Sequence, residues 1–146
     1  KTVTGSRKAT TTYDDEIDTM IQQGRQLIAD KAWVEADELL AKAHQKRIDN
    51  VPVLANLGWA RLHNPSIELD VRTEEGKDFL LLAEQFDPTD SDGQYYLAQV
   101  LLVAGRLDAA EQRAARAAKA LPEDKTRQAL LRKVRHLLKQ QQDASS

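Results

Sequence analysis

The sequence predicts an all-α protein made of stacked helix pairs, and three observations predict it. Apolar residues recur at spacings of three and four along most of the 146-residue chain, as on one face of a helix. No stretch alternates apolar and polar residues over a useful length, so no sheet is expected. Small residues recur at fixed offsets: 34 residues separate Gly24 from Gly58, and 40 separate Gly58 from Ala98. A period of about 34 residues is typical of a helical solenoid, here with an insertion in the middle repeat.

Residues 1–13 are polar and small and carry no apolar face. That composition predicts a linker or tail before the folded domain. We expect the domain to span residues 14–142 and a second short tail to span residues 143–146. The chain begins with Lys1 rather than Met, which suggests a domain of a longer protein.

The first helix pair is predicted within residues 17–50. Asp14 and Asp15 stand before it and are suited to cap its free N–H groups. Its second helix opens at Ala32-Trp33. The apolar stripes consist of Ile17, Met20, Ile21, Leu27 and Ile28 in the first helix, and Ala36, Leu39, Leu40 and Ala43 in the second.

The second pair is predicted within residues 51–90. Pro52 lies in its first helical turn, where proline is tolerated, and Pro65 ends that helix. An insertion follows in residues 64–71, and the next helix is expected from Thr73, its cap. The insertion is either a second contact site, since binding residues often collect in long loops, or a tolerated lengthening of the surface.

The third pair is predicted within residues 91–124, with Ser91 or Asp92 as the cap of its first helix and Gly105 at that helix's end. A basic amphipathic helix follows over about residues 124–141. We expect it to cover the apolar side of the last pair, because a stack of repeats needs a terminal cover with a polar outer side. A coiled-coil or membrane-surface helix is the alternative.

A marker pattern recurs in the three repeats, and the third repeat matches it best. Its matching residues are Leu97, Ala98, Gly105, Ala110, Ala117 and Pro122. This pattern resembles the tetratricopeptide repeat (TPR), and the resemblance implies a right-handed α-solenoid of three TPR helix pairs with a C-terminal capping helix. The sequence departs from the TPR pattern at Arg61 and Leu101, which occupy the tyrosine position, and at Gly76, which replaces an alanine.

The resemblance further implies a concave groove lined by the first helix of each pair. Its groove-facing positions are here Ile21, Arg25, Ile28, Ala55, Asn56, Trp59, Leu62, His63, Tyr95, Tyr96, Gln99 and Leu102. Trp59 and Tyr95 are suited to anchor a docked segment, because each ring combines a large apolar area with a polar tip. We predict that the groove binds an apolar or amphipathic peptide or helix, with Arg25, Asn56 and Gln99 fixing its backbone. The alternative for Trp59 is packing between repeats as core.

Some TPR proteins hold a C-terminal carboxylate with lysine, asparagine and arginine side chains of three repeats. Of those positions only Asn56 matches here. The others hold Ile21, Arg25, Asp92 and Tyr96. An acidic Asp92 and an apolar Ile21 would not hold a charged terminus, so we predict that this chain does not bind chaperone tails.

The composition argues against an enzyme, a cofactor or a metal site. The chain has no cysteine, its three histidines are isolated, and its six glycines form no phosphate-binding loop. The acidic clusters lie at predicted helix starts, where they offset unpaired N–H groups. His63 borders the predicted groove, either as a pH-sensitive contact or as an ordinary surface histidine.

Charge is unevenly distributed along the chain, whose net charge is −2. Up to Asp92 there are 11 Lys and Arg against 18 Asp and Glu, and from Gly93 onward there are 10 against 5. This reflects either ordinary solvated helix faces or a bipolar molecule that docks against charged partners. No nucleic-acid partner is expected, because no aromatic residue follows Tyr96 to stack on bases. No apolar run is long enough to insert into a membrane.

These observations favour a protein–protein interaction module, an adaptor or scaffold within a larger, cytoplasmic, bacterial protein. One alternative is a secretion or assembly chaperone whose groove shields an apolar segment of a client. Another is a self-association module forming a homo-oligomer, in which the acidic first part of one copy meets the basic last part of another.

Overall fold

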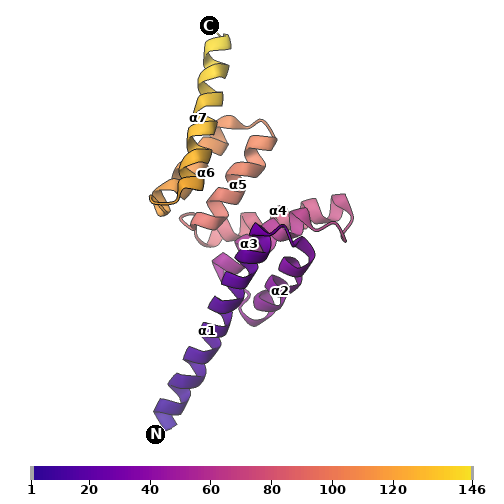
Figure 1. Ribbon diagram of the computed structural model, residues 1–146, viewed down its shortest axis with the longest axis vertical. Coiled ribbons are helices and arrows are strands. Elements are labelled where there is room, and N and C mark those ends of the chain that lie inside the picture. Colours follow the sequence, from indigo (N-terminus) through magenta and orange to yellow (C-terminus); the bar gives the residue numbers. More distant parts are fainter. Residues whose placement is uncertain (1, 146) are drawn as a thin grey trace. The chain divides into compact units, whose positions relative to one another are not determined.

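The computed structural model describes residues 2–145, and the side chains of residues 13–145. Over these residues the chain is all α-helical and contains no strand, as expected (Figure 1). It divides into two compact units, Lys1–Phe79 and Leu80–Ser146. The described helices are α1 (Thr2–Ala29), α2 (Trp33–Lys46), α3 (Val51–His63), α4 (Leu69–Phe86), α5 (Ser91–Val103), α6 (Leu107–Ala120) and α7 (Lys125–Ser145).

The core of the first unit forms where α1, α2 and α3 pack against one another. Two apolar clusters fill it: one around Ile17, Met20 and Ile21, and one around Ala36 and Leu40. The stripes predicted from helical spacing therefore face inward. Burial of such stripes stabilises helices that would be marginal in isolation.

Two glycines allow close approach between helices in this unit. A Cβ at Gly24 would lie 2.7 Å from Leu40 Cδ2. A Cβ at Gly76 would lie 2.5 Å from Leu62 Cγ and 2.8 Å from the carbonyl oxygen of Gly58. Gly76, which departs from the TPR pattern, is therefore required by the contact between α3 and the first part of α4.

The first helix begins earlier than predicted. α1 starts at Thr2, whereas the sequence predicts a tail through residue 13 and a cap at Asp14 or Asp15. Residues 2–13 contain no proline that would stop a helix. Once a helix has formed, each residue added to it gains one hydrogen bond, so α1 extends through these residues. Asp14 binds the guanidinium of Arg47 instead of capping the helix.

The loop formed by the insertion of the middle repeat is shorter than predicted, because the next helix, α4, begins at Leu69 and not near Thr73. The loop between α3 and α4 is anchored at Asn64, whose amide nitrogen donates to Asp37 Oδ2 at 2.8 Å and whose Oδ1 accepts from the Ser66 N–H at 2.9 Å. Arg72 donates to the carbonyl oxygen of Asn64 at 3.0 Å. These bonds fold the inserted residues into an ordered turn and one extra helical turn.

The second unit packs α6 between α5 and α7. Ala98, Ala114, Ala118 and Leu131 form its apolar cluster. Asp90, and not Ser91 or Asp92 as expected, caps α5 by accepting a hydrogen bond from the Gly93 N–H at 2.9 Å. α7 covers α6 with Leu131 and Val134, as the predicted capping helix should, and Figure 1 shows it continuing past α6.

Candidate functional site

The predicted groove positions of the first unit fall into two groups. Along α3, Trp59, Leu62 and His63 are partly exposed, whereas Ala55 and Asn56 are fully buried. The Asn56 amide donates to the Pro52 carbonyl oxygen at 2.8 Å within the same helix. The accessible part of this face is therefore the C-terminal half of α3.

The accessible part of α3 carries an aromatic cluster. The ring centroids of His63 and Trp59 lie 4.4 Å apart at a tilt of 60°, and His63 Nδ1 lies 2.8 Å from the Trp59 carbonyl oxygen. Because a carbonyl oxygen only accepts, Nδ1 carries the proton and Nε2 is the acceptor of the neutral ring. His63 also stacks on Trp33, with centroids 4.4 Å apart and planes 21° apart.

Trp33 was not among the predicted site residues. It is the first residue of α2. Since α2 packs antiparallel to α3, the start of α2 lies beside the end of α3, where His63 stands. Trp33 could have been identified from the antiparallel pairing, because it is a large aromatic residue at the helix start that this pairing places beside His63. We call Trp33, Trp59 and His63 the aromatic cluster.

The α1 positions differ in accessibility. Ile21 is only 5% exposed and belongs to the apolar core beside Ala43 and Val53. Arg25 and Ile28 are partly exposed, and Ile28 packs against the second core cluster. The face of α1 thus offers one cation and one partly apolar edge.

The α5 positions of the second unit include one tyrosine at the surface and one in the core. Tyr95 is partly exposed and Tyr96 is buried, with centroids 5.8 Å apart. Gln99 and Leu102 are partly exposed one and two turns further along α5. The Arg127 guanidinium lies 4.7 Å from the centroid of the Tyr95 ring. Burial raises the pKa of Tyr95, and the charge of Arg127 opposes that rise.

Arg127 attaches the capping helix to the start of α5. It is 11% exposed, its Nη2 lies 2.6 Å from Asp92 Oδ1, and its Nε lies 2.6 Å from Ser91 Oγ. Asp92, one of the positions compared with the carboxylate clamp, is therefore neutralised within the unit. Ile21, Asn56 and Tyr96, three of the other positions compared with the clamp, are buried. Arg25, the remaining position, is a partly exposed cation.

Arg61 explains a departure from the TPR pattern. Its guanidinium donates to both oxygens of Asp37, at 2.7 and 2.9 Å, and to Glu75 at 2.8 Å. It also lies 5.5 Å from the centroid of the Phe79 ring. The hydrogen bond to Asp37 raises the pKa of Arg61 above its ordinary value. Arg61 therefore binds α2, α3 and α4 together, where the TPR pattern has a tyrosine.

A second polar cluster stabilises the second unit around Glu84. Arg113 donates to both carboxylate oxygens, at 3.0 and 3.1 Å, and the buried Gln94 donates at 2.9 Å. Burial raises the pKa of Glu84, but the hydrogen bonds from Arg113 and Gln94, with the charges of Arg113 and Arg116, outweigh it. The pKa of Glu84 therefore lies below its ordinary value.

Comparison with known proteins identifies the fold. No family model and no curated protein matches the chain. Solved structures do match. The TPR domain of Sgt2 from Aspergillus fumigatus has a TM-score of 0.67 and 16% identity, over 90% of this chain and 84% of that chain. The chain has the TPR fold.

Two further TPR-fold structures contain bound peptides. The first TPR of Spaghetti (RPAP3), bound to the HSP90 peptide SRMEEVD, has a TM-score of 0.61 and 14% identity, covering 85% of this chain and 94% of that chain. The type III secretion chaperone SycD from Yersinia enterocolitica, in complex with a peptide of the translocator YopD, has a TM-score of 0.62 and 13% identity. It covers 90% of this chain and 96% of that chain.

Two further findings concern metal-ligating side chains and helix hydropathy among the described residues. No group of three His, Asp or Glu residues among them is arranged to hold a metal ion. Across the described helices, none is both long and apolar enough to cross a bilayer.

Proposed function

We propose that this chain is a protein-interaction module that binds an apolar or amphipathic peptide or helix of a partner. The observation that carries the proposal is the aromatic cluster at the accessible half of α3 and the start of α2. Its rings are half-buried rather than packed away, and Trp59 occupies a position that the TPR resemblance assigns to the groove. Half-buried aromatic rings on a rigid helix are the usual anchors of protein interfaces.

The aromatic cluster is preorganised for docking. His63 contacts the rings of Trp33 and Trp59 and the Trp59 carbonyl, so the cluster loses little side-chain freedom when a partner binds. Trp59 is followed by Leu62, which adds apolar area on the same part of α3. A partner that inserts an apolar side chain here gains contact area without first ordering the site.

The nature of the partner follows from the clamp positions. The HSP90 peptide bound by Spaghetti ends in EEVD and is acidic. In this chain the buried Ile21 and Asn56, and Asp92 already paired with Arg127, do not favour such an anion. The chain is therefore better suited to an uncharged or amphipathic segment than to an acidic C-terminus.

A second candidate function is that of an assembly or secretion chaperone. SycD was solved with a peptide of the translocator YopD, and PcrH was solved with the chaperone binding region of PopD. The same aromatic cluster would shield an apolar segment of a client. A stable partner recovered at equal stoichiometry favours the adaptor, whereas a client that is released on secretion favours the chaperone.

The test selects ligands from a phage-displayed library of 15-residue peptides and measures their affinity by calorimetry. We expect Trp59→Ala to weaken binding at least about tenfold with unchanged helicity, because truncating an aromatic anchor typically costs 2 kcal/mol or more. Val103→Ala is the matched control, since Val103 is 90% exposed and outside the predicted groove. Equal affinity of Trp59→Ala and wild type would contradict the proposal.

A further inference from the structure

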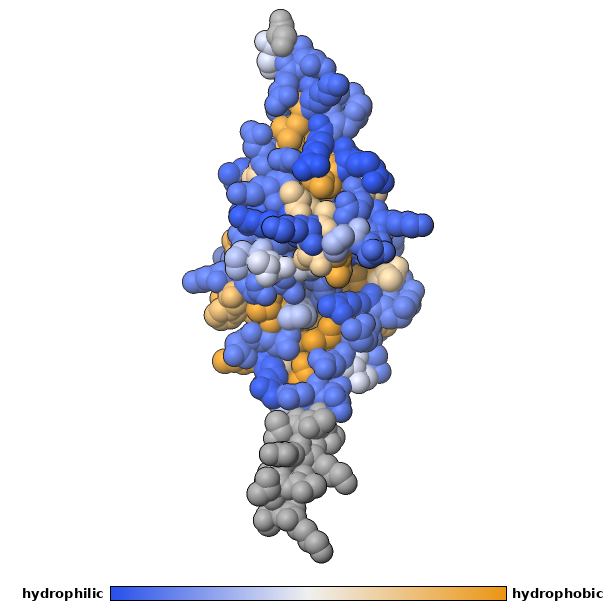
Figure 2. Space-filling model, turned by 90° about the vertical axis from the view of Figure 1, so that its left-hand side faces the viewer, coloured by the Kyte–Doolittle hydropathy of each residue, from blue (hydrophilic) through white to orange (hydrophobic). Residues whose placement is uncertain are grey.

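The outer side of α7 carries positive charge that no described residue neutralises. Arg132, Lys133 and Lys139 are exposed and form no ion pair with a described residue, whereas Arg127 and Arg135 pair with Asp92 and Glu111. At 100° per residue the three unpaired cations fall within about 120° of the helix circumference. Figure 2 shows the last turns of α7, at the upper end, covered by hydrophilic residues. We call Arg132, Lys133 and Lys139 the basic stripe.

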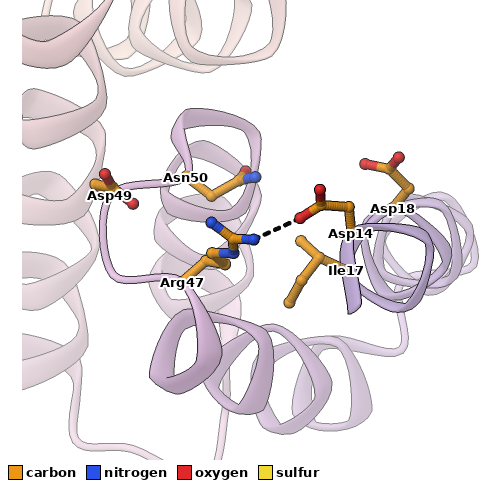
Figure 3. Close-up of a pocket in the computed structure, with 6 residues that line it drawn as sticks. All are labelled: Asp14, Ile17, Asp18, Arg47, Asp49 and Asn50. Atoms are coloured by element: carbon orange, nitrogen blue, oxygen red, sulfur yellow. Dashed lines mark hydrogen bonds and ion pairs between the residues drawn. The ribbon is translucent and has the colours of Figure 1, made fainter. Parts of the chain in front are cut away.

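A hollow of complementary charge lies in the first unit, between α1 and the turn that joins α2 to α3 (Figure 3). It has a volume of about 260 Å³ and is lined by Asp14, Ile17, Asp18, Arg47, Asp49 and Asn50. Arg47 neutralises Asp14 at 2.5 Å. Asp18 and Asp49 are exposed and form no ion pair within the described residues, so the hollow keeps two unpaired carboxylates.

The turn that lines this hollow with Arg47 and Asp49 also exposes an apolar side chain between them. Ile48, next to Asp49 in the same turn, is 69% exposed. Lysine and arginine side chains cover apolar surface with their methylene stems while their charged ends reach a carboxylate. The hollow and Ile48 together therefore suit the stem and the charged end of a basic side chain.

We propose that the basic stripe of one copy docks over the acidic hollow of a second copy. The occupant is argued from charge complementarity: the stripe offers unpaired cations, and the hollow offers unpaired carboxylates beside an exposed isoleucine. Because the two surfaces differ, the contact is heterologous, and it propagates into open chains unless the rotation between copies closes a ring. This association uses neither Trp59 nor His63 and is independent of the proposed peptide binding.

Two other occupants of the basic stripe fit the residues less well. Proteins that bind single-stranded nucleic acid pair cations with aromatic rings, and no aromatic residue follows Tyr96. A helix that lies on a membrane presents a large apolar face beside its cations, whereas Leu130 and Leu131 of α7 pack in the apolar cluster with α6, and Val134 is buried. A second copy is therefore the partner that the surface favours.

Analytical ultracentrifugation tests the association on the whole chain. At 50 mM NaCl we expect the weight-average mass to rise above the monomer mass with increasing protein concentration. At 500 mM NaCl the association constant should fall at least about tenfold, since exposed charges are screened over a few ångströms at high salt. A monomer at all concentrations in low salt would overturn the proposal.

Charge reversal identifies the surfaces. Arg132→Glu with Lys133→Glu should abolish association, and so should Asp18→Lys with Asp49→Lys, because like charges across an interface repel. An equimolar mixture of the two variants should associate again, because the unaltered stripe of the hollow variant meets the unaltered hollow of the α7 variant, and the two reversed surfaces are complementary as well. Failure of the mixture to associate would overturn the proposal.

A matched control separates the basic stripe from net charge. Arg106→Glu with Lys119→Glu changes the net charge of the second unit by the same amount outside the stripe, since both residues are exposed and neither belongs to α7. We expect this variant to associate like wild type. Loss of association in it, or salt-sensitive binding of the stripe to a DNA duplex in place of self-association, would contradict a second copy as the occupant.

Discussion

Gly76→Ala is predicted to destabilise the protein even though it restores the residue that the TPR pattern prefers. The added methyl group would lie 2.8 Å from the backbone carbonyl oxygen of Gly58 and 2.5 Å from Leu62 Cγ. Real Cβ atoms do not approach neighbours below 3.0 Å, so α3 and α4 must move apart. A backbone oxygen within a helix cannot rotate out of the way as a side chain can.

The expected magnitude combines two opposing effects. Overpacking a tight contact costs about 1–3 kcal/mol. Replacing glycine by alanine in a helix interior gains about 1 kcal/mol. We therefore expect a net loss of about 1 kcal/mol in the free energy of unfolding, which corresponds to a decrease in Tm of roughly 2–4 °C for a chain of this size.

Tryptophan fluorescence during urea unfolding measures this effect in the relevant unit. The chain has two tryptophans, Trp33 and Trp59, and both belong to the first unit with Gly76. Gly24→Ala is the matched control, because its Cβ would meet only side-chain atoms of Leu40, which can partly adjust. The loss should be larger for Gly76→Ala than for Gly24→Ala. A Gly76→Ala protein as stable as wild type would refute the reasoning.

Three further predictions concern charge and backbone conformation. Lys31 has a φ of 59°, in the left-handed region that favours glycine, and Gly105 in the corresponding turn has a φ of 77°. Lys31→Gly should therefore raise the free energy of unfolding by about 1 kcal/mol in the same urea assay, and a loss of stability would contradict this. Arg61→Met should lower the free energy of unfolding by about 3 kcal/mol, because it leaves the buried Asp37, which is 4% exposed, without its main partner. Adding Asp37→Asn to the Arg61→Met protein should recover part of the loss. Glu84 has a folded-state pKa below its ordinary value of 4.5, so its ionised form stabilises the fold above that pH and the contribution is lost as the pH falls through the folded pKa. Circular dichroism should therefore show a weaker loss of stability between pH 5 and pH 3, roughly the range of ordinary carboxylates, for Glu84→Gln than for wild type.

Helical periodicity and the recurrence of small residues were sufficient to predict the fold. The buried stripe Ala36, Leu40 and Ala43 and the glycine contact at Gly24 occur where the spacing placed them. The covering role of α7 also follows from its apolar spacing, with Leu131 and Val134 buried. These features depend on local periodicity, which a sequence records directly.

Helix starts were predicted less well, because several polar residues compete for each cap. Asp90 caps α5, and its neighbours have other partners: the Ser91 hydroxyl donates to the Ala117 carbonyl oxygen, and Asp92 pairs with Arg127. α4 begins at Leu69, since Arg72 and Asn64 stabilise a turn that the sequence does not reveal. Which polar residue caps a helix therefore depends on bonds to residues that are distant in the sequence, and local sequence does not record these.

The sequence predicts which repeat positions the candidate site occupies, but not which of those side chains are exposed. Trp59 and His63 lie on the accessible half of α3, but Asn56 and Ile21 are buried, since each depends on the rotation of its helix against neighbours. Trp33 was missed because it belongs to the second helix of its pair and reaches His63 only through antiparallel packing. Whether the predicted groove residues bind a peptide together stays a prediction.

The most direct test of the central claim is a titration of the ¹⁵N-labelled protein with a selected peptide, followed by NMR. Trp33→Phe assigns the indole N–H signal of Trp59. We predict that the peptide shifts the Trp59 indole signal and the amides of the second half of α3 more than those of α2 beyond its first turn. An unchanged Trp59 signal, with shifts gathered on α2 or α6, would contradict the account.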